Sequence, residues 1–159
     1  MIYSCMPNVD YKFKVPSFSH QAIATRDIKP GEQLFGAYCG LNRTKTERQT
    51  DLVRYGFSCN CPACANATPA TDKLRKTFND QISRYHALVK QPGGGTTDVL
   101  SSVLLLETEM VAEGLDCTVE FCTLLTVIHM SFSKLGRRAE MAMYEKRLRE
   151  YLKIHAPGL

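Results

Sequence analysis

Short apolar runs of strand-like length mark the first third of the chain. Residues 9–13 and 21–25 alternate or run apolar with Val, Ile, Tyr and Phe, and Pro16 lies between them. A further apolar run at residues 34–38 follows a Pro-Gly pair at residues 30–31, which suits a tight turn. This pattern predicts three short strands.

A helix start signal follows the third run. Thr44 and Glu47 have the spacing of a capping box, in which each side chain accepts a hydrogen bond from the other residue's backbone amide. The helix is expected to run to about Tyr55, and Gly56 suits a left-handed cap at its end.

Beyond residue 70 the apolar positions recur with helical spacing in four segments, at residues 72–90, 97–113, 117–135 and 137–155. Proline or glycine closes the first three, at residues 92–95, 114 and 136. Short connections make successive helices antiparallel neighbours, so we expect two helical hairpins. Two such pairs resemble a minimal tetratricopeptide-like array, although no 34-residue signature repeats, and a plain bundle stays open.

The first part of the chain has strand-like apolar runs and the second has helical spacing, which together predict an α+β protein. Residues 65–71 are small, polar and Pro-containing, as in a linker. The sequence therefore predicts a small β-rich part at residues 1–64, a linker at 65–71 and a helical region at 72–159.

Composition narrows the class of protein. The chain has 159 residues, a formal charge of +4, 44% hydrophobic and 23% charged residues, all close to globular averages. No apolar run reaches the roughly 20 residues of a membrane span, and no secretory leader is visible. We expect an intracellular protein of the nucleus, the cytoplasm or both. The modest positive excess shows no aromatic stacking pattern, which argues against a nucleic-acid partner.

The chemistry is concentrated in a cysteine cluster. Cys59, Cys61 and Cys64 form C-x-C-x-x-C, and the residues between them give no apolar face that packing would need. Zinc takes four ligands in a tetrahedron, so one ligand is missing locally. The fourth must come from a more distant residue, namely Cys5, Cys39, Cys117, Cys122 or a histidine. No metalloprotease helix, nucleophile elbow or phosphate loop offers a competing site.

Four segments together resemble a known family. They are residues 4–8 (SCMPN), 28–34 (IKPGEQL) leading to Tyr38, 46–48 (TER) and 55–64 (YGFSCNCPAC). In order and spacing they resemble the C-terminal half of a SET domain with its post-SET zinc loop. The resemblance is closest to the SET and MYND type of protein-lysine methyltransferase, particularly the fungal members, and it covers residues 2–64.

The resemblance implies roles for individual residues. Cys5 would supply the fourth zinc ligand beside the C-x-C-x-x-C loop. Tyr38 would be the catalytic tyrosine that orients the substrate lysine amine, and Tyr55 would line the channel for the lysine side chain. Ser4 and Asn8 would lie at the binding site of the cofactor, S-adenosylmethionine. The partner would be a protein substrate, histone or non-histone.

Departures from the family pattern qualify this picture. Ile2-Tyr3 stand where the family has Asn-His near the cofactor adenine. The family's Gly-x-Gly cofactor segment and MYND zinc module have no counterpart in the chain, so we expect a truncated gene product or a member lacking its first half. The first hypothesis is an S-adenosylmethionine-dependent lysine methyltransferase. The alternative is a non-catalytic, zinc-stabilised protein-interaction module.

Overall fold

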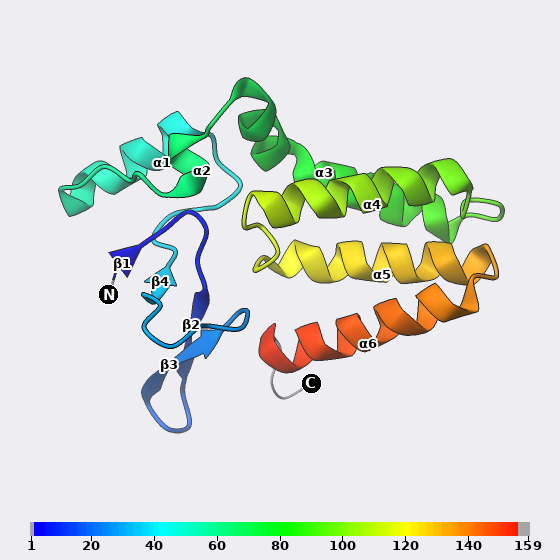
Figure 1. The fold of residues 1–159 in the computed structure, drawn as a ribbon, viewed down its shortest axis with the longest axis horizontal. Coiled ribbons are helices and arrows are strands. Elements are labelled where there is room, and N and C mark those ends of the chain that lie inside the picture. Colours follow the sequence, from blue (N-terminus) through cyan, green and yellow to red (C-terminus); the bar gives the residue numbers. More distant parts are fainter. Residues whose placement is uncertain (1, 156–159) are drawn as a thin grey trace. The chain divides into compact units, whose positions relative to one another are not determined.

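The computed structural model describes residues 2–155, and these divide into two compact units (Figure 1). Unit 1 contains the chain up to Lys76 together with Glu113–Cys117. Unit 2 contains Thr77–Ala112 and the chain from Thr118 onwards. No helix within residues 2–155 combines the length and apolar character that crossing a membrane requires.

Two small sheets form the β part of unit 1. Strands β2 (Val9–Lys14) and β3 (Ser19–Ala24) pair antiparallel, as the two apolar runs predict. The third predicted strand is shorter than expected: β4 covers only Phe35–Gly36 and pairs in parallel with β1 (Ile2–Tyr3). Strand β1 was not predicted, because two residues carry no periodicity.

Gly36 is required where these strands meet the hairpin. A Cβ at this position would lie 2.5 Å from Cε2 of Tyr11, so the aromatic ring occupies the space that any other residue would need. The absence of a side chain thus lets β2 approach β4 closely.

The helix after the strands forms as its end signals predict. Helix α1 covers Lys45–Leu52, and the short 3₁₀ helix η1 covers Val53–Tyr55. The capping box is present: the Glu47 amide donates to Thr44 Oγ1 at 3.3 Å, and the Thr44 amide donates to Glu47 Oε2 at 2.8 Å. Gly56 ends the segment with φ +74°. A further single turn, α2 (Pro62–Ala65), was not predicted.

The four predicted helices are all present. They are α3 (Pro69–Lys90), which begins in unit 1, α4 (Thr97–Ala112), α5 (Val119–Lys134) and α6 (Arg138–His155). Within unit 2 successive helices run antiparallel (Figure 1), as short connections require. A tetratricopeptide-like arrangement of these helices stays a prediction.

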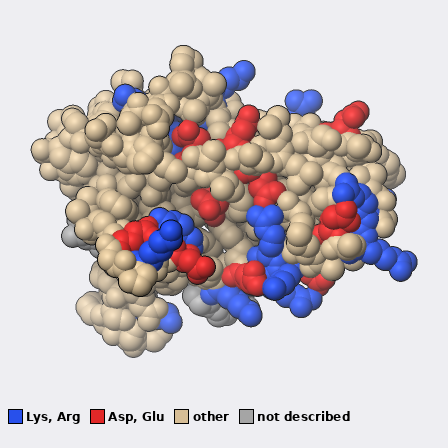
Figure 2. All heavy atoms as spheres, viewed as in Figure 1, with Lys and Arg blue, Asp and Glu red and all other residues tan. Residues whose placement is uncertain are grey.

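The core of unit 2 is apolar with one buried acid. Leu124 and Ile128 of α5 are fully buried, whereas Glu107 of α4 is buried beside α6. Tyr144 donates to Glu107 Oε2 at 2.6 Å, and Arg147 forms an ion pair with the same carboxylate. The outer surface of α6 mixes both signs of charge, and Figure 2 shows basic and acidic side chains interspersed in this region.

Candidate metal centre and aromatic channel

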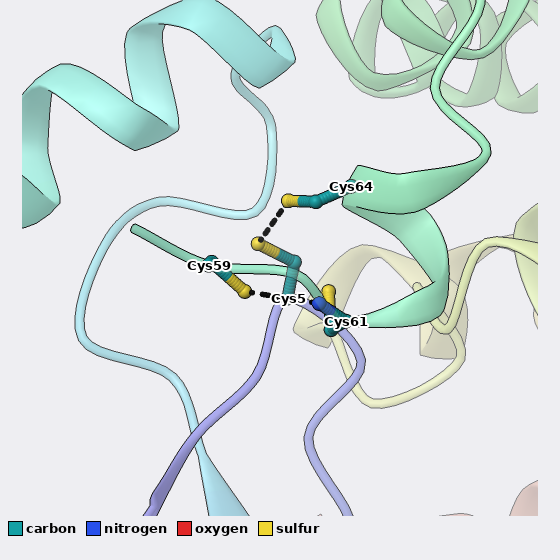
Figure 3. Close-up of side chains that lie close together, drawn as sticks. All are labelled: Cys5, Cys59, Cys61 and Cys64. Atoms are coloured by element: carbon teal, nitrogen blue, oxygen red, sulfur yellow. Dashed lines mark hydrogen bonds between the residues drawn. The ribbon is translucent and has the colours of Figure 1, made fainter. Parts of the chain in front are cut away.

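The four cysteines singled out by the sequence lie together in unit 1. Their Sγ atoms are all within 4.8 Å of one another (Figure 3). Cys5 follows β1, Cys59 and Cys61 lie on the loop between η1 and α2, and Cys64 lies on α2. The Sγ atoms of Cys5 and Cys64 are 3.4 Å apart.

This geometry fits a single tetrahedral ion. Zn–S bonds near 2.3 Å place the sulfurs of a tetrahedral site about 3.8 Å apart, which lies within the spread observed here. Cys5 and Cys64 are 0% and 1% exposed, so two of the ligands approach from the protein interior. The group could therefore hold a metal ion, and its all-thiol donor set is one of those found at structural zinc sites.

The thiols influence one another's protonation. The hydrogen bond from Cys5 lowers the pKa of Cys61, and the same pairing together with burial raises the pKa of Cys5. Cys61 is thus the first of the pair to become a thiolate, which is the form that binds metal.

The other distant candidates lie outside the group of four. The Tyr3 hydroxyl lies between Cys39 and the group, since Tyr3 Oη is 2.9 Å from Cys39 Sγ and 3.0 Å from Cys5 Sγ. Cys117 directs its thiol to the carbonyl of Gly114 at 3.4 Å. Among the described residues, the fourth sulfur that completes the group is therefore that of Cys5.

Four aromatic rings gather beside the cysteines. The ring centroids of Tyr38 and Tyr55 are 5.4 Å apart, as are those of Tyr3 and Tyr38. Phe57 closes the group, with its ring centroid 5.7 Å from that of Tyr3 and 6.5 Å from that of Tyr55. Tyr3 is 6% exposed and Tyr55 49%, so the cluster runs from the interior to the surface. The structure thus brings together the two tyrosines that the resemblance associates with lysine.

Ser4 and Asn8 differ in their surroundings. Asn8 is fully buried, and its amide Nδ2 donates to Glu32 Oε1 at 3.0 Å and to the Gln33 carbonyl at 2.9 Å. Its Oδ1 accepts from the Phe35 amide at 2.7 Å. The whole Asn8 amide is therefore engaged in holding the turn before β4. Ser4, whose hydroxyl accepts from the Met6 amide at 3.0 Å, instead lines a cleft.

That cleft lies between β1 and the cysteine loop. Its volume is about 570 Å³, and its walls include Tyr3, Ser4, Arg26, Phe57 and Asn60. Small-molecule sites in proteins have volumes of roughly 300–1,000 Å³, so the cleft has a suitable size for a ligand.

Arg48 is the residue that sequence reasoning missed. It is 0% exposed, and its guanidinium lies among the cysteine sulfurs. The only signal was its position four residues before the buried Leu52, which places both side chains on one face of α1.

Comparison with known proteins finds relatives among lysine methyltransferases. No family model matches the chain. The sequence is 27% identical over 168 residues to the histone-lysine N-methyltransferase set5 of Schizosaccharomyces pombe, covering 97% of this chain and 52% of that protein. It is 41% identical over 63 residues to the histone-lysine N-methyltransferase SET5 of Yarrowia lipolytica, covering 39% of this chain and 14% of that protein. It is 36% identical over 66 residues to the protein-lysine N-trimethyltransferase SMYD5 of Mus musculus, covering 39% and 16%.

The resemblance carried by the motifs is thus confirmed. The chain is similar in sequence to SET-domain protein-lysine methyltransferases, among them SET5 and SMYD enzymes. It spans just over half the length of the fission-yeast relative and a smaller share of the other two.

Proposed function

We propose that this chain carries the lysine-binding part of an S-adenosylmethionine-dependent protein-lysine methyltransferase site, supported by a structural zinc ion. The observation that carries the proposal is the packing of Tyr38 and Tyr55, with ring centroids 5.4 Å apart, beside four clustered cysteines. The named activities of the relatives support it.

Methyl transfer to lysine mainly requires the protein to align the two reactants. S-adenosylmethionine supplies the methyl group, and the lysine amine must be neutral and aligned with it for in-line displacement. An aromatic channel desolvates the amine and thereby favours its neutral form. In this proposal Tyr55 and Phe57 line the channel, and the Tyr38 hydroxyl orients the amine.

Zinc would be bound by Cys5, Cys59, Cys61 and Cys64. Four protein ligands close the coordination sphere, so the ion would serve structure rather than catalysis. It would fasten the segment after β1 to the loop that carries Phe57, and thus hold the channel wall in place.

The cleft beside β1 is the proposed cofactor side of the site. Ser4 faces it directly, whereas Asn8 would act through the turn that its amide holds. Tyr3 lies where the family has histidine, and burial raises the pKa of its hydroxyl, which keeps it neutral between two sulfurs. Because the chain spans just over half the length of the fission-yeast relative, we expect these 159 residues alone to bind S-adenosylmethionine weakly and to methylate nothing.

Transfer of labelled methyl groups to a protein lysate tests the proposal. The chain would be assayed alone and fused behind the N-terminal half of the fission-yeast relative. The fusion should label protein, and Tyr38→Phe should abolish the labelling because the amine loses its orienting hydroxyl. Tyr85→Phe, on α3, is the matched control and should retain it.

Two results would contradict the proposal. Labelling that is indifferent to Tyr38→Phe would remove Tyr38 from the site. A folded, zinc-containing fusion that transfers no methyl group would favour the non-catalytic interaction module instead.

A further inference from the structure

The side chain of Arg48 is buried against the sulfurs of the candidate metal centre. Its Nε donates to Cys5 Sγ at 3.1 Å, and its Nη2 donates to Cys64 Sγ at 3.6 Å. The remaining nitrogen, Nη1, donates to the backbone carbonyl of Arg43. All three nitrogens of this fully buried guanidinium are thus engaged, two of them with cysteine sulfurs.

A buried cation needs an anion close by, because removing it from water is costly. Within residues 2–155, Arg48 forms no ion pair with a carboxylate. Arg75 shows the ordinary solution in the same unit: it is 1% exposed, and its guanidinium pairs with the Glu113 carboxylate at 3.0 Å. For Arg48 the sulfurs of Cys5 and Cys64 would take this place, because a bound divalent ion would hold them as thiolates.

A metal centre of four cysteines would carry a net negative charge, opposite to the positive charge of Arg48. Four thiolates around one divalent ion leave an excess of two negative charges, and the two sulfurs beside Arg48, those of Cys5 and Cys64, are buried away from the water that would screen them. A guanidinium beside two of the sulfurs would neutralise half of that excess. Its N–H groups would also form charge-assisted hydrogen bonds, which are stronger than neutral ones.

We infer that Arg48 is the built-in counter-charge of a four-thiolate metal site, and that it positions Cys5 and Cys64 as ligands. The inference rests on the proposed zinc site and extends it, because it makes metal affinity depend on a residue of α1 that binds no metal itself. Arg48 acts through the cysteines and is a positioning residue.

Chelator competition on the full 159-residue chain measures the effect. Loss of such partners around a metal typically weakens binding about 10–100-fold, and we expect this range for Arg48→Met, which keeps an unbranched, flexible side chain and removes the guanidinium with its charge. Arg75→Met is the matched control, since it removes an equally buried arginine whose partner is a carboxylate. It should leave zinc affinity unchanged, even if it lowers stability.

Substitution of Co²⁺ for Zn²⁺ gives a second readout that a purely structural role would not move. Hydrogen bonds from Arg48 lower the energy of the sulfur lone pairs, so their loss should shift the sulfur-to-cobalt charge-transfer band to longer wavelength. If Arg48→Met does not fold, Arg48→Lys decides the matter. It retains the charge but replaces the fork by a single nitrogen, and a reduced zinc affinity would support the inference.

The outcomes separate the two claims. A wild-type chain that takes up neither Zn²⁺ nor Co²⁺ would overturn the metal centre and the role of Arg48 with it. A wild-type chain that binds zinc, with Arg48→Met binding as tightly and an unshifted cobalt spectrum, would overturn the role of Arg48 alone. Arg48→Lys binding as tightly, with an unshifted cobalt spectrum, would overturn the positioning of Cys5 and Cys64 by the guanidinium.

Discussion

Replacing Cys5 with serine should remove the metal and loosen the cysteine-bearing part of unit 1. A serine hydroxyl does not ionise near neutral pH and is a poor zinc ligand, so a site of four thiolates becomes one of three. Cys5 is also the only one of the four that comes from the N-terminal segment. Its loss therefore breaks the connection between that segment and the loop at residues 57–64.

The size of the effect follows from what else holds that loop. Zinc binding in small structural sites contributes on the order of 10 kcal/mol to folding. Without zinc, the Gln49 side chain still accepts from the Cys59 amide at 3.0 Å and donates to the Cys59 carbonyl at 2.8 Å. At about 1 kcal/mol net for each hydrogen bond, these contacts replace only a small part of the metal's contribution.

Circular dichroism distinguishes the two units in this experiment. The chain has no tryptophan, so near-ultraviolet signals come mainly from tyrosine and phenylalanine, including the cluster around Tyr38. Cys5→Ser should lose zinc by metal analysis and lose much of the near-ultraviolet signal, while most far-ultraviolet helical signal persists. Cys122→Ser, on α5 and outside the cysteine group, should change neither. Full zinc occupancy in Cys5→Ser would refute the reasoning.

Two further substitutions test the support of the same loop and helix. Gln49→Ala should lower the free energy of unfolding by roughly 1–3 kcal/mol in urea denaturation, because it leaves the Cys59 amide and carbonyl without their partner. An effect below experimental error would show that water replaces the Gln49 side chain. Glu47 has its pKa lowered to about 2, first by the Thr44 backbone amide, so its stabilising effect is present above its ordinary pKa and is lost as the pH falls toward 2. The melting temperatures of wild type and Glu47→Gln should therefore converge between pH 5 and 2, and a constant difference would contradict this account.

Elements governed by local signals were predictable from the sequence. The capping box at Thr44, the glycine at position 56 and the glycine-closed helical segments depend on residues within one or two turns of each other. The hairpin of β2 and β3 is likewise local, since its strands are adjacent in the chain. In each case the interactions that define the element lie inside the window that a sequence pattern covers.

Features set by distant contacts were not predictable in this way. The parallel pairing of β1 with β4 joins residues more than thirty positions apart, and neither strand is long enough to alternate. Arg48 is typical of an exposed helical position, and only the fold turns it toward the sulfurs. The C-x-C-x-x-C loop identified three members of the cysteine group by spacing, whereas Cys5 came from the family resemblance.

Tyr3 connects the two parts of the candidate site. Its hydroxyl lies 3.0 Å from Cys5 Sγ, while its ring packs against those of Tyr38 and Phe57. A buried ring in contact on several sides cannot shift without moving its neighbours, because protein interiors are close-packed. A displacement of Cys5, whether by metal loss or by a different ligand, is therefore expected to shift Tyr3 and, with it, the tyrosines proposed to bind lysine. The zinc centre and the channel are thus expected to fail together, even though the metal itself would take no part in methyl transfer.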